Sequence, residues 1–243
     1  MVPASPEAFA TALGLAFRDP ALLRAALTHR SAGSANNERL EFLGDAVLGV
    51  IVAEALYRAT ATGLRPGAAP DDEGALSRLR ASLVNERVLA AVATELGLGE
   101  ALTLGPGELK SGGFRRESIL ADAYEALVGA VYLDTGLEAA RALVLRNFAS
   151  RLANLPDPAA LKDPKTRLQE RLQGEGRALP EYSVVAVEGA DHDQTFRVRC
   201  ALRQPALAAD GAGRSRREAE QSAAAALLAQ LALVDRSGER ADG

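Results

Sequence analysis

The chain has few of the residues from which many enzymes build their sites. Its 243 residues include one cysteine, Cys200, two histidines, His29 and His192, and no tryptophan. A single cysteine excludes an internal disulfide and a cysteine metal cluster, and it favours a reducing compartment. Two histidines far apart in sequence indicate neither a histidine-rich metal site nor a triad with an obvious nucleophile. Covalent catalysis is therefore not indicated.

Long apolar runs and a strong positive charge are also missing. No apolar stretch is long enough to span a bilayer, and the N-terminus has no basic region followed by an apolar one. We therefore expect a cytoplasmic protein with no membrane partner. The net charge of −4 does not indicate a nucleic-acid partner, so only local clusters can support one. With 48% hydrophobic residues, the chain can build a proper core in one large or two modest domains.

Acidic residues recur along a segment with the period of a helix, between Asn36 and Leu48. The acids share one side of this predicted helix, beside an apolar side, and are Glu38, Glu41 and Asp45. A solvated acidic face explains this segment equally well. A partly desolvated stripe, in contrast, needs protons or cations, because stacked carboxylates repel each other.

A second segment favours the cation. Residues 118–133 are almost wholly apolar and predict a core helix, yet they carry Asp122 and Glu125 one turn apart with no Lys or Arg among them. A metal shared with the first acidic stripe accounts for both anomalies. Carboxylate oxygens without Cys or His favour a hard divalent ion, Mg²⁺ or Mn²⁺.

These two segments resemble the motifs of bacterial ribonuclease III. The first is Glu-Arg-Leu-Glu-Phe-Leu-Gly-Asp at residues 38–45, and the second runs from Gly112 through Glu125. The resemblance covers the chain from about Leu13 to about Leu233. It implies an all-α endonuclease domain that hydrolyses duplex RNA with metal-activated water and leaves 5′-phosphate and 3′-hydroxyl ends. Ribosomal and messenger RNA precursors are the substrates that it implies.

The resemblance also implies roles for the acids. It implies that Glu41, Asp122 and Glu125 bind Mg²⁺, with Mn²⁺ as a substitute and no small-molecule cofactor, and that Asp45 and Glu38 act close by in catalysis together with Glu125. Cutting both strands requires two sites, which the family provides by forming a homodimer. Phe42 resembles the residue that plugs the partner subunit, and a Phe buried within its own subunit is the alternative.

A glycine-rich stretch precedes the second acidic segment. Four glycines between Gly105 and Gly113 lead into Arg115 and Arg116, which connectivity places near the metal site as possible phosphate contacts. A simple turn between helices is the alternative. For His29 we expect a structural role, as a hydrogen-bond partner of a loop, and a contact with a phosphate is the alternative. Thr60 to Asp72, rich in Gly, Pro and Ala, predicts an exposed loop.

The sequence pattern changes from helical periodicity to a mixture of helical and strand-like segments after a proline-containing linker. We expect a helical domain over residues 1–155 that carries the metal site and dimerises, a linker over 156–162, a second domain over 163–234 and a flexible tail over 235–243. The sequence pattern of the second domain predicts the order α-β-β-β-α in about seventy residues. This order resembles that of the double-stranded-RNA-binding domain. The fold class is thus an all-α endonuclease domain followed by a small α+β domain.

That second resemblance implies three places of contact with duplex RNA. Side chains of the first helix would reach one minor groove, a hairpin residue would enter the next, and the start of the last helix would face phosphates between them. In this order the residues are Thr166, Gln169 and Gln173, then His192, then Arg214, Arg216 and Arg217. Glu218 and Glu220 dilute the last basic cluster, so we expect modest, salt-sensitive affinity.

Two other classes of function compete with an endonuclease. A non-catalytic, dimeric duplex-RNA binder has no need of five acids in two apolar helices. A phosphate-ester enzyme acting on small molecules leaves the C-terminal domain unexplained. We therefore predict an endoribonuclease with duplex RNA and a second copy of the chain as partners.

Overall fold

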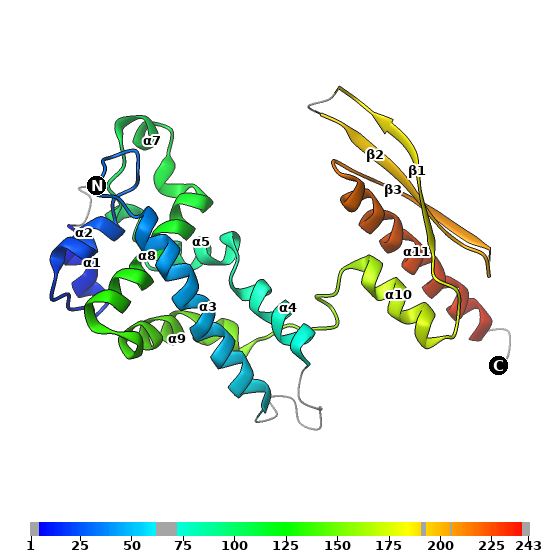
Figure 1. Cartoon of the computed structure of the whole chain (residues 1–243), viewed down its shortest axis with the longest axis horizontal. Helices are drawn as coiled ribbons and strands as arrows, with labels where there is room; N and C mark the ends of the chain where they lie inside the picture. Colours follow the sequence, from blue (N-terminus) through cyan, green and yellow to red (C-terminus); the bar gives the residue numbers. More distant parts are fainter. Residues whose placement is uncertain (1–4, 62–71, 191–192, 205, 240–243) are drawn as a thin grey trace. The chain divides into compact units, whose positions relative to one another are not determined.

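The computed structural model describes residues 5–61, 72–190, 193–204 and 206–239. It divides into two compact units, Met1–Leu161 and Lys162–Gly243. The first is helical, and the second has the order α-β-β-β-α, so the predicted fold class is confirmed (Figure 1). The helices of the first unit are α1 Pro6–Ala12, α2 Pro20–Ala26, α3 Glu38–Ala61, α4 Glu73–Leu83, α5 Glu86–Glu95, α6 Leu98–Ala101, α7 Pro106–Lys110, η1 Gly113–Arg115, α8 Glu117–Thr135 and α9 Leu137–Ala153.

Helix α8 forms the centre of the first unit. Its side chains are apolar almost all round, and Tyr124, its largest fully buried side chain, packs against Phe148 of α9. A helix that is apolar on every side must be covered on every side, and helices α2, α3, α5 and α9 all contact it. The acids of α8 therefore lie inside a protein core or at its edge.

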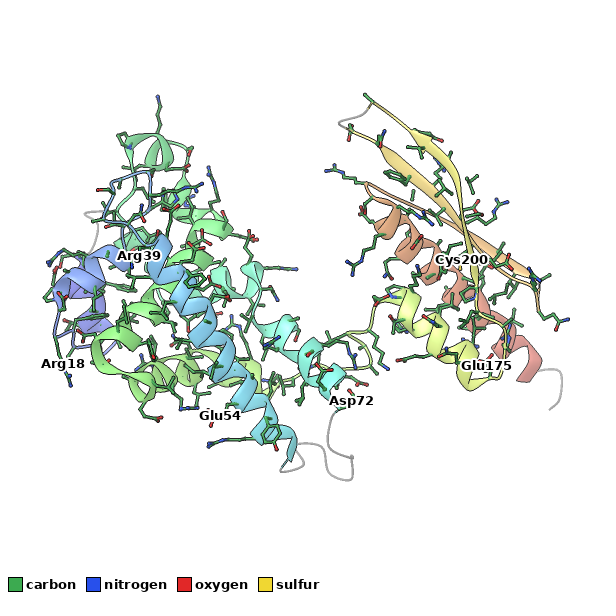
Figure 2. The ribbon with its side chains drawn as sticks, viewed as in Figure 1. Arg18, Arg39, Glu54, Asp72, Glu175 and Cys200 are labelled. Atoms are coloured by element: carbon green, nitrogen blue, oxygen red, sulfur yellow. The ribbon has the colours of Figure 1, made fainter. Side chains whose placement is uncertain are left out.

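Helix α3 crosses α8 at backbone contact. A Cβ atom added to Gly44 would overlap the carbonyl oxygen of Glu125, and one added to Gly129 would overlap the carbonyl oxygen of Leu40. Glycine on both sides thus allows an approach that any larger residue prevents. Arg39 lies at the start of α3 and Glu54 in its second half (Figure 2), and the crossing lies nearer to Arg39.

The glycine-rich stretch before α8 differs from the predicted loop. It contains the short helix α7 and the 3₁₀ turn η1. Pro106 occupies the first turn of α7, where its missing N–H costs nothing. Gly112 adopts φ 80°, a left-handed conformation that joins the two turns. Gly112 therefore serves the local turn between α7 and η1.

The second unit is a three-stranded antiparallel sheet with order β1-β2-β3. Its elements are α10 Pro164–Gly174, β1 Glu181–Glu188, β2 Thr195–Leu202, β3 Leu207–Gly213 and α11 Arg216–Glu239. Leu168 and Leu172 of α10, Leu227 of α11 and Cys200 of β2 share a separate core. Cys200 lies on the middle strand of this sheet (Figure 2), so the lone cysteine is a buried core residue.

The segments around the predicted domain boundaries include residues with defined contacts and helical structure. Leu155 and Leu161 pack on the core of the first unit, and Arg78 Nε donates a hydrogen bond of 3.2 Å to the carbonyl oxygen of Pro158. The predicted linker therefore lies against the helical unit. Helix α11 continues to Glu239, beyond the predicted domain end at Val234. Most of the predicted loop between Thr60 and Asp72 lies outside the described residues.

The length and apolar character of the described helices decide whether any of them could span a membrane. Within the ranges given above, none of them has both the length and the apolar character needed to cross a bilayer.

Candidate metal centre

Three carboxylates meet where α3 crosses α8. Glu41 of α3 and Asp122 and Glu125 of α8 each offer one oxygen, and these oxygens lie within 4.8 Å of one another. Asp122 and Glu125 share a side because they are one helical turn apart. Glu41 joins them because Gly44, less than one turn further along α3, rests on the backbone of Glu125. The structure thus brings together the three acids predicted as metal ligands.

The protein holds these carboxylates in an unfavourable electrostatic environment. Burial, followed by the charges of Asp45, Glu41 and Asp122, raises the pKa of Glu125 to about 8. Burial and the charges of Asp122, Glu38 and Asp45 raise the pKa of Glu41, against an opposing effect of Arg30. Ionised, half-buried carboxylates need a counter-charge.

The donor set fits a hard divalent cation. Three carboxylate oxygens within 4.8 Å of one another, with no sulfur or imidazole among them, are the ligands that Mg²⁺ and Mn²⁺ prefer. A cation between them would offset both the burial and the mutual repulsion that raise their pKa values. Protons are the alternative counter-charge, and the pKa of Glu125 shows that this side chain takes one near neutral pH when no cation is present.

The other two predicted acids lie outside this three-oxygen group. Asp45 is exposed on α3, one turn beyond Glu41, and acts on Glu125 through its charge. Glu38 begins α3 and forms an ion pair of 3.5 Å with Arg30, with 54% of its side chain exposed. Asp45 and Glu38 thus surround the group without joining it.

One charged residue near the metal centre has no signal in the sequence. Burial and then the charge of Glu86, at the start of α5, raise the pKa of Asp122, while His29 and Arg30 oppose this. Glu86 follows the cap residue Asn85, so a helix start explains it fully from the sequence. Only the packing of α5 on α8 brings it to the site.

His29 ties two loops together, as its predicted structural role requires. Its ring Nδ1 lies 2.8 Å from Ser31 Oγ, and that hydroxyl accepts a hydrogen bond from the backbone N–H of Gly105. The imidazole is buried and holds the segment before α3 against the segment before α7.

Comparison with known proteins bears directly on this centre. A family model described as Ribonuclease-III-like matches residues 19–152, and one described as Double-stranded RNA binding motif matches residues 164–231. Ribonuclease 3 of Alkalilimnicola ehrlichii is 54% identical over 230 residues, which cover 95% of this chain and 97% of the relative. Ribonuclease 3 of Xanthomonas axonopodis pv. citri is 56% identical over 219 residues, which cover 90% and 93%.

The chain belongs to the ribonuclease III family. It is therefore an enzyme of the endoribonuclease class, as the sequence predicted. A solved nuclease domain of ribonuclease III from Campylobacter jejuni matches with a TM-score of 0.55 and 42% identity, covering 62% of this chain and 97% of that one. The helical unit is thus the nuclease domain of this ribonuclease III chain, and the second unit is its double-stranded-RNA-binding domain.

The RNA contacts predicted on α10 share one side of that helix. Gln169 and Gln173 are exposed, and Thr166 is half-buried in the first turn. Another side of the helix carries Leu168 and Leu172, which the domain core buries. His192, predicted for the next minor groove, lies outside the described residues.

The basic residues at the start of α11 are exposed but not all free of partners. Arg216 Nε lies 3.0 Å from Oε1 of Glu220, whose other oxygen pairs with Lys165 of α10. Glu218 accepts a hydrogen bond of 2.8 Å from the backbone N–H of Arg214. The two glutamates that we expected to dilute the cluster therefore cap α11 and join it to α10.

The predicted phosphate contacts before α8 have protein partners of their own. Arg116 forms an ion pair of 3.1 Å with Glu108, and the guanidinium of Arg115 lies 4.9 Å from the centre of the Phe114 ring. Phe42, predicted for the dimer interface, is 82% exposed, which excludes the alternative of a Phe buried in its own subunit.

Proposed function

We propose that the chain is a homodimeric, Mg²⁺-dependent endoribonuclease that hydrolyses both strands of duplex RNA to 5′-phosphate and 3′-hydroxyl ends. The observation that carries this proposal is the meeting of Glu41, Asp122 and Glu125 at the α3–α8 crossing. Ribosomal and messenger RNA precursors in the cytoplasm are the proposed substrates, because the family resemblance implies them and a domain that reads A-form shape selects duplexes rather than sequences.

In this proposal the three carboxylates would bind the ion, and the surrounding acids would orient the attacking water and a neighbouring arginine. Glu41, Asp122 and Glu125 would be the ligands of Mg²⁺, with Mn²⁺ as a substitute. The bound ion supplies Lewis-acid stabilisation of the phosphodiester and lowers the pKa of water. Asp45 is exposed and acts on Glu125 through its charge, which suits a group that would accept a hydrogen bond from the attacking water. Glu38 has an oxygen paired with Arg30 and would orient that arginine toward the substrate.

The proposed dimer is supported by an exposed apolar stripe on α3. Phe42 and Val50 are 82% and 58% exposed and lie two turns apart on this helix, with the exposed Ala46 between them. Leaving such large apolar side chains in water is unfavourable, so we propose that a second copy of the chain buries this stripe. A second solved structure of the Campylobacter jejuni nuclease domain, at 44% identity and a TM-score of 0.54, is described as flexible in a region involved in dimer formation.

Changing Phe42 to Ala should shift the protein from dimer to monomer. Loss of an aromatic anchor costs about 2–4 kcal/mol at an interface, which is about 30-fold or more in the dimer dissociation constant. Sedimentation velocity measures the shift, and Leu133→Ala, at an exposed apolar residue of α8, is the control that should remain dimeric. A Phe42→Ala protein that is still fully dimeric at micromolar concentration argues against this interface.

The direct test of the proposed activity is incubation of the purified chain with long duplex RNA. We expect short duplex products in Mg²⁺ or Mn²⁺, no cleavage in EDTA, and 5′ ends that a phosphatase must treat before kinase labelling. Single-stranded RNA of the same sequence is the control and should remain intact. Duplex RNA that is bound but uncut in both metals would support the non-catalytic binder instead.

A further inference from the structure

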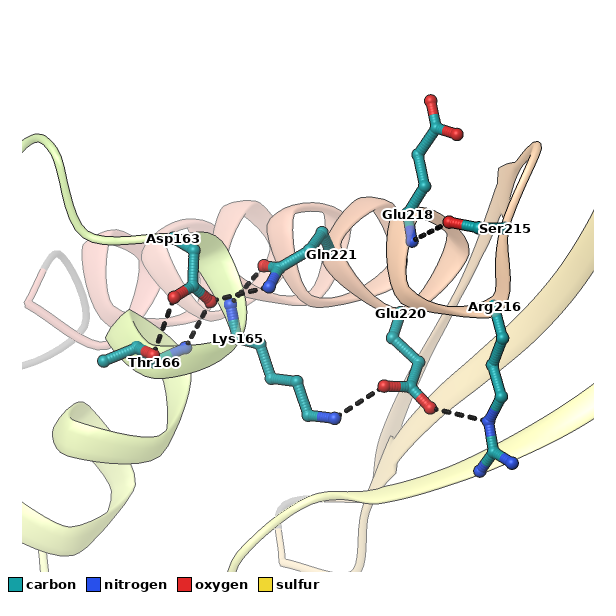
Figure 3. A network of polar contacts seen from close by, with 8 residues as sticks. All are labelled: Asp163, Lys165, Thr166, Ser215, Arg216, Glu218, Glu220 and Gln221. Atoms are coloured by element: carbon teal, nitrogen blue, oxygen red, sulfur yellow. Dashed lines mark hydrogen bonds and ion pairs between the residues drawn. The ribbon is translucent and has the colours of Figure 1, made fainter. Parts of the chain in front are cut away.

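One aspartate accepts hydrogen bonds from the first turn of α10 and from α11 (Figure 3). Asp163 caps this helix, and its Oδ1 accepts hydrogen bonds from the backbone N–H of Thr166 at 3.0 Å and from Gln221 Nε2 at 2.7 Å. Its Oδ2 accepts a third hydrogen bond, from the Thr166 hydroxyl at 2.8 Å. The backbone bond is an ordinary helix cap. The bond to the hydroxyl adds something that a cap does not require.

The direction of that bond follows from the chemistry of the two groups. An ionised carboxylate can only accept hydrogen bonds, so the Thr166 hydroxyl must donate its single hydrogen. Burial acts to raise the pKa of Asp163, but the bonds from the Thr166 N–H, Gln221 and the Thr166 hydroxyl outweigh it and hold that pKa below its usual value. At neutral pH the Thr166 oxygen therefore has only lone pairs left for any other partner.

We propose that Asp163 is a positioning residue that makes Thr166 an acceptor-only contact, selective for hydrogen-bond donors in the minor groove of RNA. The inference rests on the proposed binding of duplex RNA by this domain. The minor groove offers two kinds of donor, the ribose 2′-hydroxyl and the 2-amino group of guanine. Its other polar atoms, purine N3, pyrimidine O2 and ribose O4′, are acceptors and cannot bond to Thr166 in this state.

The position of Thr166 is fixed as well as its polarity. Gln221 of α11 also accepts a hydrogen bond of 3.0 Å from the backbone N–H of Lys165, and the Lys165 ammonium lies 2.6 Å from Glu220. Glu220 in turn pairs with Arg216, a predicted phosphate contact. The first turn of α10 is thereby joined to the first turns of α11 (Figure 3). An anchored hydroxyl loses little freedom when RNA binds.

Asp163→Asn reverses the polarity of Thr166 and keeps the cap. The amide oxygen must remain at the Oδ1 position, because two donors, the Thr166 N–H and Gln221 Nε2, point at it. The amide nitrogen then replaces Oδ2 and donates to the Thr166 oxygen. The hydroxyl hydrogen is released, and Thr166 can donate to an acceptor in the groove.

The test compares the affinities of the full chain for matched duplexes of about 20 bp, longer than the ~16 bp that one domain spans. Binding is measured in EDTA by fluorescence anisotropy, with unmodified RNA, RNA with 2′-O-methyl groups, and RNA with inosine in place of guanine. The 2′-O-methyl group keeps an acceptor oxygen and removes the donor, and inosine removes the 2-amino donor. Steric costs of the methyl group act equally on both proteins and cancel in the ratio.

For each protein, the loss of affinity on a modified duplex is measured relative to unmodified RNA. We expect this loss to be about fivefold larger for the unaltered protein than for Asp163→Asn on one of the two modified duplexes. Loss on 2′-O-methyl RNA identifies the 2′-hydroxyl as the donor, and loss on inosine RNA identifies the guanine amine. Equal losses for the two proteins on both duplexes overturn the inference. An unaltered protein that binds no duplex RNA at all overturns the proposed function with it.

Three further variants separate polarity from charge and from folding. Glu170→Gln removes one negative charge from an exposed position of α10, and it should leave the dependence on modified RNA as in the unaltered protein. Thr166→Val removes the hydroxyl, so the extra fivefold loss of affinity on the modified duplex should disappear. Adding Asp163→Asn to Thr166→Val should then cause no further change in this loss. Thr166→Ser restores a hydroxyl and should restore the dependence. Circular dichroism verifies that each variant is folded.

Discussion

Glu125→Gln is expected to abolish cleavage of duplex RNA and, without metal, to make the nuclease domain more stable. The amide keeps the size of the side chain but is a poor ligand for Mg²⁺, so the cleavage rate should fall by about a thousandfold or more. Duplex binding should remain within about twofold, because the second unit is unchanged. The gain in stability follows from the raised pKa of Glu125, which shows that its ionised form is disfavoured in the fold.

The stability effect has a defined direction with pH. The pKa of Glu125 is about 8 in the folded protein against 4.5 for an ordinary glutamate. Its favourable contribution is therefore complete below about pH 4.5 and is lost as the pH rises through about 8. Because the side chain is partly solvated, we expect a loss of roughly 2–3 kcal/mol, or roughly 5–10 °C in the melting temperature of the nuclease domain.

Thermal unfolding in EDTA between pH 5 and 9 measures this effect. The unaltered protein should lose stability toward high pH, Glu125→Gln should lose much less, and saturating Mg²⁺ in place of EDTA should remove the difference between pH values. Glu117→Gln, at an exposed acid on the same helix, is the control and should behave as the unaltered protein. A metal-free melting temperature that does not depend on pH would mean that the three carboxylates do not share one site.

The metal centre was predictable from the sequence because acids in an apolar helix are anomalous by themselves. Asp122 and Glu125 stand in a run with no neutralising base, and this fact alone calls for a partner. The family motifs then supplied Glu41 as the third member, which the structure places beside them. The α-β-β-β-α order was likewise predictable from the change in periodicity after residue 164.

What the sequence could not supply are features that arise only from packing. The role of Glu220 is one example, since a glutamate among arginines suggests weaker RNA binding until the structure shows it between Lys165 and Arg216. The approach of Glu86 to Asp122 is another, because it depends on how α5 lies on α8. The short helix α7 was not predicted because four glycines in nine residues favour a loop in any local scheme.

The second large effect is expected at Gly44, where α3 touches α8. Gly44→Ala places a methyl group on the carbonyl oxygen of Glu125 and 3.1 Å from the backbone nitrogen of Gly129. Neither atom can move without moving α8, so the helices must separate. We expect a loss of about 3 kcal/mol or more in the free energy of unfolding. Separation also pulls Glu41 away from Asp122 and Glu125, so metal affinity and cleavage should both fall.

Gly49→Ala is the matched control on the same helix. A Cβ at Gly49 meets no atom within 4 Å, so the substitution should stabilise α3 by about 0.5–1 kcal/mol through helix propensity alone. Thermal unfolding and calorimetric titration with Mn²⁺ compare the two variants. If the metal centre depends on backbone contact between the helices, one methyl group must destroy the site at Gly44 and leave it intact at Gly49. Equal Mn²⁺ affinity in both variants would show that the carboxylates converge for some other reason.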